Sequence, residues 1–361
     1  MKNLVFVTPL PSPFVEAVIL RLPDFAPELN VTPIFYGDCS HRPDWGTSEW
    51  KGITIDPQHK KLKAELIAVI EKQNPDGILL SGYGSQIQWA ARKWAIQNRK
   101  PFFMVLSEPP SPVEGLKRIV RRQLIRRFLT SCSGLGCMGP RAVQEYSNIY
   151  DGPIAETPYA FDLTPLLQHE RPRSIGESGL TFLFSGRITA QRNPLLVLEA
   201  FSAVNQQHKE TRLIFSGRGP LEDAINARVE KLGLSHAVKW MNDFSGWHDI
   251  MNFYRYGDIL VSCSNHNTWN LPIQEAMASG LGIIATWTTE AATALLVNDY
   301  NGILIQPANL HSLRQAMLRY VENPELAESH GKLSREVVQT IDARKVAERL
   351  AGLLNVGLNQ Y

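Results

Sequence analysis

Residues 180–206 read LTFLFSGRITAQRNPLLVLEAFSAVNQ, a short apolar run followed by a polar loop and a stretch with helical periodicity. The run Leu180–Phe184 is aromatic and uncharged, which is typical of a strand buried inside a parallel sheet. Apolar residues recur at helical spacing over Leu195–Gln206, and Pro194 stands where a helix begins. A strand, a loop and a helix in this order predict the repeating unit of an α/β fold.

The same alternation recurs along the rest of the chain. In the second half, further strands are expected over Arg212–Phe215, Val238–Trp240, Ile259–Ser262 and Gly282–Ala285. The helices expected there span Leu221–Leu232, Trp247–Arg255, Ile273–Ala278 and Leu310–Glu322. In the first half, the expected strands are Leu4–Val7, Gly77–Leu80 and Phe102–Leu106, and the expected helices are Leu62–Lys72 and Ile87–Gln97. We therefore predict an α/β protein with two Rossmann-like domains, each a parallel sheet wrapped by helices.

Length and composition agree with two domains. A chain of 361 residues, 44% hydrophobic and 20% charged, is long enough to bury two cores. A polar stretch over residues 169–179 separates the two repeats, so we place the first domain over residues 1–165 and the second over residues 166–335. Open α/β sheets bind ligands at the carboxyl ends of their strands. A ligand cleft is therefore expected where the two domains face each other.

The composition argues against several classes of protein. The net charge of +2, with 37 basic residues spread widely, indicates no nucleic-acid partner. No apolar run reaches the roughly 18 residues of a transmembrane helix, and the run after Lys2 is too short for a signal peptide. Without a C-x-x-C pair or metal-ligand spacing, the cysteines suit reduced thiols in a cytoplasmic protein. They are Cys39, Cys132, Cys137 and Cys263.

Glycine pairs follow two of the expected strands, but neither pair forms a complete nucleotide-binding motif. Gly82 with Gly84 and Gly217 with Gly219 lack the third glycine of G-x-G-x-x-G, and the chain holds no P-loop sequence. These glycines suit tight turns, and they can also admit a ligand phosphate close to the backbone. No D-x-D triplet occurs, so we expect no metal site and no cofactor. A bound diphosphate would then be neutralised by cationic side chains.

Two arginines supply such cations directly after the strand at residues 180–184. Arg187 follows the strand, and Arg192 stands before the helix that begins near Pro194. Cationic side chains at the carboxyl edge of a sheet, beside a helix N-terminus, favour an anion. The alternative is that both arginines are solvated loop residues.

Residues 261–280 read VSCSNHNTWNLPIQEAMASG, again a buried strand, a polar loop and a helix. The stretch resembles the retaining glycosyltransferases of family 4. The residues that match the family motif are Ser264, Trp269, Glu275, Ala276, Met277, Ala278 and Gly280. The resemblance covers about residues 180–320 and includes SGRGPL at residues 216–221 and NDYNGILIQP at residues 298–307. The combined spacing is specific, although each piece alone is weak.

The resemblance implies the GT-B architecture, in which two Rossmann-like domains face each other across a cleft. It implies a donor nucleotide on the second domain, and a helix over Ala343–Leu358, within residues 336–361, that crosses back to the first. By the same resemblance, Arg187 and Arg192 would contact the donor diphosphate. Glu275 would accept hydrogen bonds from the ribose hydroxyls.

The remaining donor-side candidates lie near these three residues. Backbone amides at Asn270 and Leu271 would hold phosphate oxygens, because they open the helix that carries Glu275. The other candidates are Gly186, Gly217, Gly219 and Trp269.

Two positions depart from the family motif. The family's first glutamate, which contacts the donor sugar, is Asn267 here, and the glycine after the aromatic residue is Asn270. Asn267 can hydrogen-bond a sugar hydroxyl but carries no charge for an oxocarbenium-like transition state. This change is compatible with an altered donor, with slower chemistry or with an inactive binding protein.

The first domain matches the family less well. Many members place a histidine in the cleft from this domain, and neither His41 nor His59 follows an expected core strand. The candidates for the acceptor side follow two expected strands and are Tyr83, Ser85, Ser107 and Glu108. A carboxylate such as Glu108 could orient or deprotonate an acceptor hydroxyl, or it could simply decorate a helix start. A retaining reaction without a covalent intermediate requires no protein base.

Residues 115–129 read GLKRIVRRQLIRRFL, a basic amphipathic helix. Its apolar face is expected to hold Leu116, Ile119, Val120, Gln123, Leu124 and Phe128. The basic residues fall largely on the other face and are Lys117, Arg118, Arg121, Arg122 and Arg126, with Arg127 beside them. Such a helix can lie on anionic lipid. The alternative is a solvated basic face over an ordinary buried stripe.

These observations predict a retaining, metal-independent hexosyltransferase of the cytoplasm, with possible contact to the inner face of the membrane. Its donor would be a nucleotide-diphosphate sugar, with a UDP-sugar favoured over a GDP-sugar, and its acceptor a saccharide or a lipid-linked saccharide. The main alternative is a non-catalytic GT-B homologue that binds a nucleotide sugar or a partner glycosyltransferase. A nucleotide-sugar epimerase of the same shape would need cleft carboxylates and histidines that the sequence does not place there.

Overall fold

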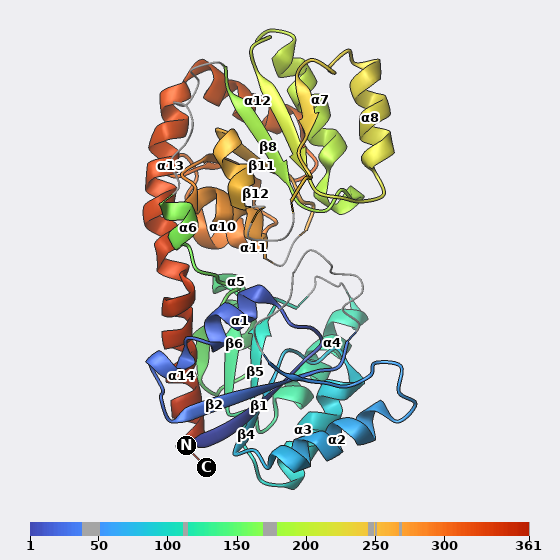
Figure 1. Ribbon diagram of the computed structural model, residues 1–361, viewed down its shortest axis with the longest axis vertical. Helices are drawn as coiled ribbons and strands as arrows, with labels where there is room; N and C mark the ends of the chain where they lie inside the picture. The colour runs from blue at the N-terminus through green and yellow to red at the C-terminus, as the bar shows by residue number, and fades with distance from the viewer. Residues whose placement is uncertain are drawn as a thin grey trace. The chain divides into compact units, whose positions relative to one another are not determined.

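The structure is a computed structural model that describes residues 1–37, 51–110, 115–168, 179–244, 249, 251–266 and 269–360. The chain divides into two compact units, each of which is described here by itself. Unit 1 comprises Met1–Asp162 with Ile341–Tyr361, and unit 2 comprises Leu163–Thr340. Figure 1 shows that each unit holds its own sheet and its own set of helices.

Unit 1 contains a seven-stranded parallel sheet in the order β3-β2-β1-β4-β5-β6-β7. Its strands are β1 (Lys2–Thr8), β2 (Leu29–Phe35), β3 (Ile53–Thr54), β4 (Gly77–Leu80), β5 (Phe102–Ser107), β6 (Gly134–Cys137) and β7 (Ile154–Glu156). The interior strand β1 is buried over most of its length, as its continuous apolar run requires. Four of these strands, β2, β3, β6 and β7, were not predicted.

Helices cover both faces of this sheet. They are α1 (Pro13–Ile19), α2 (Leu62–Gln73), α3 (Gln86–Gln97), α4 (Leu116–Leu129), α5 (Pro140–Ser147) and α14 (Ala343–Leu358), with the 3-10 turn η1 (Leu22–Asp24). One core layer joins the sheet to α2, α3, α4 and α5, and the other joins it to α1 and α14. The last helix therefore packs within the unit formed by the first part of the chain.

Unit 2 contains a six-stranded parallel sheet in the order β10-β9-β8-β11-β12-β13. Its strands are β8 (Thr181–Ser185), β9 (Arg212–Ser216), β10 (Val238–Trp240), β11 (Ile259–Ser262), β12 (Gly282–Thr286) and β13 (Ile303–Ile305). Both sheets are parallel throughout, so the prediction of an α/β protein with two Rossmann-like sheets is confirmed.

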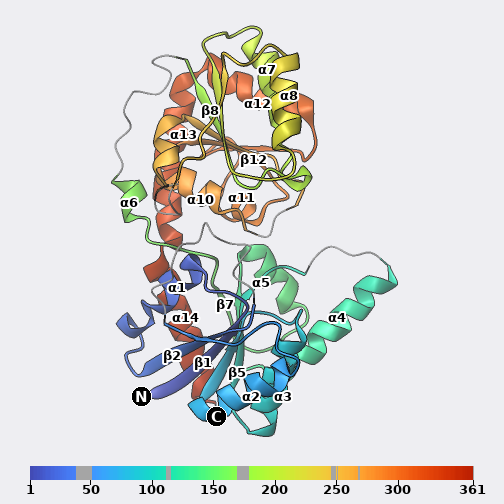
Figure 2. The ribbon, with the colours of Figure 1, turned by 45° about the vertical axis from the view of Figure 1, so that its right-hand side comes forward.

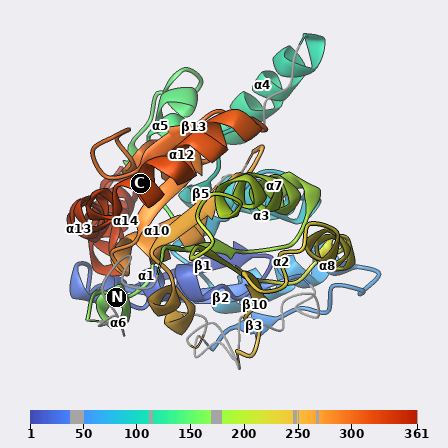
Figure 3. The same cartoon turned by 90° about the horizontal axis from the view of Figure 1, so that it is seen from above.

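The helices of unit 2 are α6 (Thr164–Leu167), α7 (Pro194–Asn205), α8 (Glu222–Lys231), α10 (Leu271–Ala278), α11 (Glu290–Leu295), α12 (Leu310–Glu322) and α13 (Pro324–Val338). Helix α7 packs between α8 and α12 on one face of the sheet (Figure 3). Helices α10 and α13 pack against β12 from the other face. Within the helix expected over Trp247–Arg255, Asp249 is helical, and the described residues from Met251 onward form the 3-10 turn η5 (Met251–Tyr256) instead of an α-helix.

Proline and capping side chains explain where several helices begin. Proline stands in the first turn of α1, α5, α7, α10 and α13, where its missing N–H leaves no intrahelical bond unmade. Asn309 caps α12 by accepting a hydrogen bond from the Ser312 amide at 2.9 Å. Among the described residues, no helix is both long enough and apolar enough to cross a membrane.

Candidate functional site

Two loops at the carboxyl edge of the unit 2 sheet are joined by hydrogen bonds. The loop after β8 meets the loop after β11, because these two strands are neighbours in the sheet. Asn193 donates through Nδ2 to the Cys263 carbonyl at 2.8 Å, and the Asn265 amide donates to the Gln191 carbonyl at 2.9 Å. The first loop carries both arginines of interest. The second leads into α10, which carries Glu275.

Arg192 is held by neutral partners on the second loop. Its Nη1 donates to Asn270 Oδ1 at 2.7 Å and lies 3.3 Å from Ser264 Oγ, while Asn270 Nδ2 donates to Ser262 Oγ at 2.5 Å. Burial, together with the charge of Arg187, lowers the pKa of Arg192 to about 10. Asn270 therefore fixes a guanidinium that burial and a neighbouring cation both disfavour.

Arg187 is exposed to solvent, and its charge acts on Arg192. The structure thus brings the two predicted cations to one place. Two guanidinium groups repel each other, and an anion bound beside them relieves that repulsion with charge-assisted hydrogen bonds. A diphosphate suits such a pair because it offers several oxygens.

Glu275 lies in α10 and is 4% exposed. Its carboxylate accepts a short hydrogen bond from the Tyr254 hydroxyl, and the Tyr254 oxygen lies 3.1 Å from Ser185 Oγ. Burial and the Glu275 carboxylate raise the pKa of Tyr254 well above its usual value, so Tyr254 remains a donor. Tyr254 and the end of β8 therefore orient the carboxylate that the family resemblance assigns to the ribose.

The sequence did not single out Tyr254 or Ser185. Tyr254 lies in η5, about twenty residues before Glu275, and no motif links the two positions. Ser185 ends β8, directly before the glycine and arginine that were singled out. Only the adjacency of β8 to β11 brings these hydroxyls to the carboxylate.

The residues that open α10 are buried. Trp269 is 5% exposed and donates through Nε1 to Gln274 Oε1 at 3.2 Å, and Asn270 is 2% exposed. Leu271 begins α10 and is followed by Pro272. Phosphate contacts through the amides of Asn270 and Leu271 stay a prediction. Asn267, the departure from the family glutamate, lies outside the described residues.

The donor-side glycines allow two loops to touch. A Cβ on Gly217 would meet the Gly186 carbonyl oxygen at 1.9 Å, and one on Gly219 would meet the Ile188 carbonyl oxygen at 2.4 Å. The Gly217 amide already donates to Asn242 Oδ1 at 2.7 Å, and the Gly219 amide to Glu222 Oε1 at 2.6 Å. Close packing explains these two glycines, while a direct donor contact stays a prediction.

Gly186 needs its own explanation. Its φ of +127° is a backbone conformation that other residues rarely adopt, and a Cβ there would meet nothing within 4 Å. The turn after β8, not crowding, therefore requires glycine immediately before Arg187.

A separate pocket of about 270 Å³ lies beside β9 and β10. It is lined by Arg218, Glu222, Asn226, Trp240, Asn242 and Asp243. None of these residues belongs to the network of Arg192 or Glu275. Among the described residues, no group of three or more His, Cys, Asp or Glu side chains is placed to hold a metal ion.

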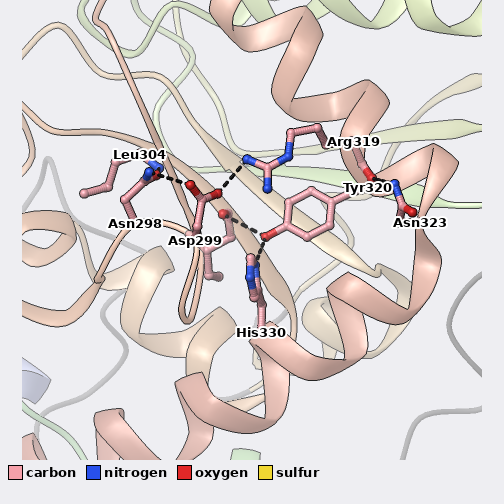
Figure 4. Close-up of polar contacts among 8 residues, drawn as sticks. Asn298, Asp299, Leu304, Arg319, Tyr320, Asn323 and His330 are labelled. Atoms are coloured by element: carbon pink, nitrogen blue, oxygen red, sulfur yellow. Dashed lines mark hydrogen bonds and ion pairs between the residues drawn. The ribbon is translucent and has the colours of Figure 1, made fainter.

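The family segment at residues 298–307 forms a turn that leads into β13. Asp299 accepts from Arg319 Nη1 at 2.6 Å, and Asn298 Oδ1 accepts from the Leu304 amide at 2.8 Å (Figure 4). Beneath this turn, the Tyr320 hydroxyl lies 2.8 Å from Nδ1 of the buried His330 (Figure 4). Polar contacts to α12 and α13 hold this segment in place. These contacts explain why its polar residues occur here, and no bound ligand is needed to explain them.

The acceptor candidates of unit 1 differ in their surroundings. Ser85 caps α3 by accepting from the Ile87 amide at 3.1 Å, and Ser107 is buried at the end of β5. Tyr83 is half-buried, and burial raises its pKa, with opposing effects from the charges of Arg121 and Glu108. The Glu108 side chain is exposed. Tyr83, Glu108 and Arg121 therefore lie near one another.

The expected face of the basic helix was wrong in part. Helix α4 exposes Leu116, Ile119, Val120 and Leu124, which had been placed on the same face as Phe128. The side that packs against unit 1 holds Ile125, Phe128 and Leu129 instead. Phe128 anchors the helix, whereas the four apolar residues before it face solvent. An ordinary buried stripe is therefore contradicted for this part of the helix.

Comparison with known proteins matches the second half of the chain to a glycosyltransferase family. Residues 168–337 match the family model described as "Glycosyl transferases group 1". Over 179 residues, the chain is 27% identical to the lipopolysaccharide core biosynthesis mannosyltransferase LpcC of Rhizobium leguminosarum bv. viciae, a match that covers 48% of this chain and 49% of LpcC. It is 22% identical to the putative glycosyltransferase EpsD of Bacillus subtilis, with 49% and 45% covered. The matches span about half the length of these curated relatives.

Solved structures resemble the whole fold. The structure of Alr3699/HepE from Anabaena in complex with UDP aligns with a TM-score of 0.77 and 14% identity, covering 98% of this chain and 100% of that one. A glycosyltransferase from Rickettsia africae aligns with a TM-score of 0.75 and 16% identity, covering 98% of both chains. These likenesses show the GT-B fold that the sequence predicted.

Proposed function

We propose, from the membership of residues 168–337 in the glycosyl transferases group 1, that this chain transfers a hexosyl group from a nucleotide-diphosphate sugar to a saccharide or lipid-linked saccharide acceptor. The observation that carries the proposal is the pairing of half-buried Arg192 with exposed Arg187 after β8, with Arg192 hydrogen-bonded to Asn270, directly before the helix that carries Glu275. Cations for a diphosphate and an acceptor for ribose hydroxyls are the two groups that such a donor needs.

Each residue takes a role that follows from its chemistry. Arg187 and Arg192 neutralise the diphosphate, and Arg192 is oriented for this by Asn270 and Ser264. Glu275 accepts hydrogen bonds from the ribose hydroxyls, with Tyr254 fixing its position. As the glycosidic bond breaks, negative charge grows on the leaving phosphate, where the guanidinium groups stabilise it.

The proposed reaction retains the configuration of the transferred sugar, as is typical of the family. The bond between the anomeric carbon and the phosphate oxygen breaks, and the acceptor oxygen bonds to that carbon from the same face. The departing phosphate takes the acceptor proton, so no protein base is required. Because two arginines supply the positive charge, no metal is required either.

The donor we favour is a UDP-sugar, with a GDP-sugar as the alternative. The structural neighbour HepE from Anabaena was solved in complex with UDP and with UDP-glucose. A mannosyltransferase is among the sequence relatives. We place the reaction in the cytoplasm, because the spacing of the cysteines in the sequence suits reduced thiols.

A calorimetric titration tests the donor site. The purified chain is titrated with UDP, GDP and ADP in turn, in the presence of a chelator. We expect saturable binding of one nucleotide, with UDP the strongest. Binding of none of the three would overturn the donor site.

A second candidate function is supported by Asn267. This residue stands where the family has the glutamate that contacts the donor sugar, which suits a homologue that binds a nucleotide sugar without transferring it. Release of UDP from a UDP-sugar that depends on an added acceptor separates the two functions. We expect Asn267→Glu to change donor preference or rate more than UDP affinity, and equal rates and preferences in both proteins would argue against a role at the sugar.

A further inference from the structure

Helix α4 presents an apolar surface to solvent. Leu116, Ile119, Val120 and Leu124 are 75%, 59%, 61% and 46% exposed, and we refer to these four side chains as the α4 apolar surface. At about 100° per residue they span about 140° of the helix circumference. Exposed apolar residues scattered singly need no explanation, but four within nine positions of one helix face form a patch.

The opposite side of the helix fixes it to unit 1. Ile125, Phe128 and Leu129 are buried against the sheet and α3. Arg92 of α3 donates to the carbonyl of Phe128 at 2.7 Å and to that of Thr130 at 3.1 Å. These contacts hold the C-terminal end, and the N-terminal half of α4 extends away from the sheet of unit 1 (Figure 2). The α4 apolar surface is therefore presented by a helix whose C-terminal end is fixed to unit 1.

Cations flank the α4 apolar surface. Helix α4 contains six basic residues and no acidic one, and they are Lys117, Arg118, Arg121, Arg122, Arg126 and Arg127. Five of the six are exposed, and Arg121 is half-buried beside Tyr83. On the helical wheel, Lys117 and Arg121 border one side of the apolar surface, and Arg122 and Arg126 border the other. A surface of this kind meets lipid phosphates at its borders and acyl chains at its centre.

We propose that α4 binds the surface of a bilayer that contains anionic lipids, with the α4 apolar surface entering the boundary between headgroups and acyl chains. Membrane-surface helices combine these features: an apolar face that enters the lipid and cations that attract anionic headgroups. A free polyanion would engage the cations alone and leave the apolar residues in water. Arg121 links α4 to Tyr83 and Glu108, so binding at this surface also brings lipid toward the proposed acceptor side of unit 1.

Sedimentation with vesicles tests this inference with a readout separate from sugar transfer. The full chain is mixed with vesicles of phosphatidylcholine and phosphatidylglycerol, and in parallel with vesicles of phosphatidylcholine alone. We expect strong binding to the anionic vesicles, weaker binding to the neutral ones, and a loss of binding as salt increases. Lys117→Gln/Arg126→Gln should weaken binding about 25-fold, because each basic residue that borders the apolar surface contributes about fivefold near the membrane. Ile119→Ser/Val120→Ser should weaken it by at least about tenfold.

Matched controls lie elsewhere on the chain. Leu310→Ser/Val356→Ser removes two apolar side chains that are 45% and 49% exposed, and Lys63→Gln/Lys72→Gln removes two exposed charges of α2. Both controls should bind vesicles as the parent does. UDP affinity should be equal in all five proteins, which separates this surface from the donor site.

Three results would overturn the inference. The first is a parent that does not sediment with anionic vesicles. The second is loss of binding in the charge variant but not in the Ser variant, which would assign the cations to a free polyanion. The third is self-association that Ile119→Ser/Val120→Ser abolishes without any vesicle binding, which would assign the surface to a second copy of this chain.

Discussion

Arg192 is a half-buried arginine whose proposed function depends on its positive charge. Its hydrogen-bond acceptors among the described residues, Asn270 and Ser264, are neutral, so its charge is compensated by no carboxylate contact. We expect Arg192→Ala and Arg187→Ala each to weaken UDP binding by about 1–3 kcal/mol, or about 5- to 150-fold, in calorimetric titrations. The loss should be equal for UDP and for inorganic pyrophosphate, because both ligands present the diphosphate.

A matched charge control separates this effect from net charge. Lys231 ends α8 on the same unit and is exposed, so Lys231→Ala should leave UDP affinity unchanged. Unchanged affinity in both arginine variants would remove them from the donor site. Arg187→Ala carries the sharper test, because Arg187 is exposed and we expect its removal to leave the fold intact.

Tyr254 is a positioning residue for Glu275. We expect Tyr254→Phe to lower UDP affinity several-fold and leave pyrophosphate affinity unchanged, because Glu275 serves the ribose and not the diphosphate. Loss of a hydrogen bond to a charged group should also cost about 1.5–3 kcal/mol of stability. Competition titrations with UDP and with pyrophosphate measure the ratio of the two affinities in the parent and in the variant.

Tyr320→Phe provides the control for Tyr254→Phe. Tyr320 is also a fully buried tyrosine of unit 2, and its hydroxyl contacts the Ile283 carbonyl and His330 instead of Glu275. The Tyr320→Phe variant should be less stable than the parent, and its ratio of UDP affinity to pyrophosphate affinity should be unchanged. The same change of ratio in both variants would mean that Tyr254 acts only through general stability.

Helices α12 and α13 contact each other through the titratable side chain of His330. His330 in α13 is 1% exposed and lies against Tyr320 of α12. Burial is the largest effect on the pKa of His330, and it lowers that pKa. The backbone carbonyl and the carboxylate of Asp299 raise the pKa, and the charge of Arg319 lowers it. The folded pKa therefore lies below that of the unfolded chain, and the unfolded state binds more protons between the two values.

This pair should make unit 2 sensitive to acid. Stability from neutral His330 is present above about pH 6.5, the unfolded value, and is lost as the pH falls through the lower folded pKa. We expect the melting temperature of unit 2 to fall from about pH 7 to about pH 5. His330→Gln, whose side-chain amide can still form a hydrogen bond with the Tyr320 hydroxyl, should reduce this dependence. An identical pH profile in the variant would show that other groups cause the loss.

Continuous apolar strands were predictable, and irregular elements were not. The runs that form β1, β8 and β11 are interior strands of their sheets. Because such strands are buried on both faces, their residues are almost continuously apolar, and this pattern is visible in the sequence. Strand β6 reads GLGC and β2 contains Pro33, which obscure strand propensity. Helix α13 is polar and contains Gly331, a residue that is unfavourable inside helices. Glycine is required at this position because a Cβ would meet the Gly280 carbonyl oxygen at 2.1 Å. Tertiary packing determined these elements.

At the scale of the whole molecule, some residues of the candidate site were predictable from sequence motifs, and others depend on the order of strands in the sheet. Arg187, Arg192 and Glu275 follow from motifs, because each lies at a strand end or on the helix after it. Tyr254 reaches Glu275 only through the order of strands in the sheet, which local patterns do not contain. The exposed side of α4 was likewise set by which residues the sheet buries, and the helical pattern alone favoured another face.

The last helix offers a way to assign separate melting transitions to the two units. Helix α14 follows unit 2 in sequence, but its apolar residues belong to the core of unit 1, where Leu354 is fully buried. Truncating a buried leucine typically costs about 2–5 kcal/mol. We expect Leu354→Ala to lower the melting temperature of unit 1 by about 5–15 °C in differential scanning calorimetry. A ligand stabilises only the unit that binds it, so UDP should raise the other transition.

Val356→Ala is the matched control, because this side chain lies on the same helix and is 49% exposed. It should leave both transitions unchanged. In Leu354→Ala, the transition that falls should be the one that UDP does not shift, and UDP affinity should equal that of the parent. If the transition that UDP raises also falls in Leu354→Ala, the two units unfold as one, and the final helix transmits stability from the first sheet to the donor site.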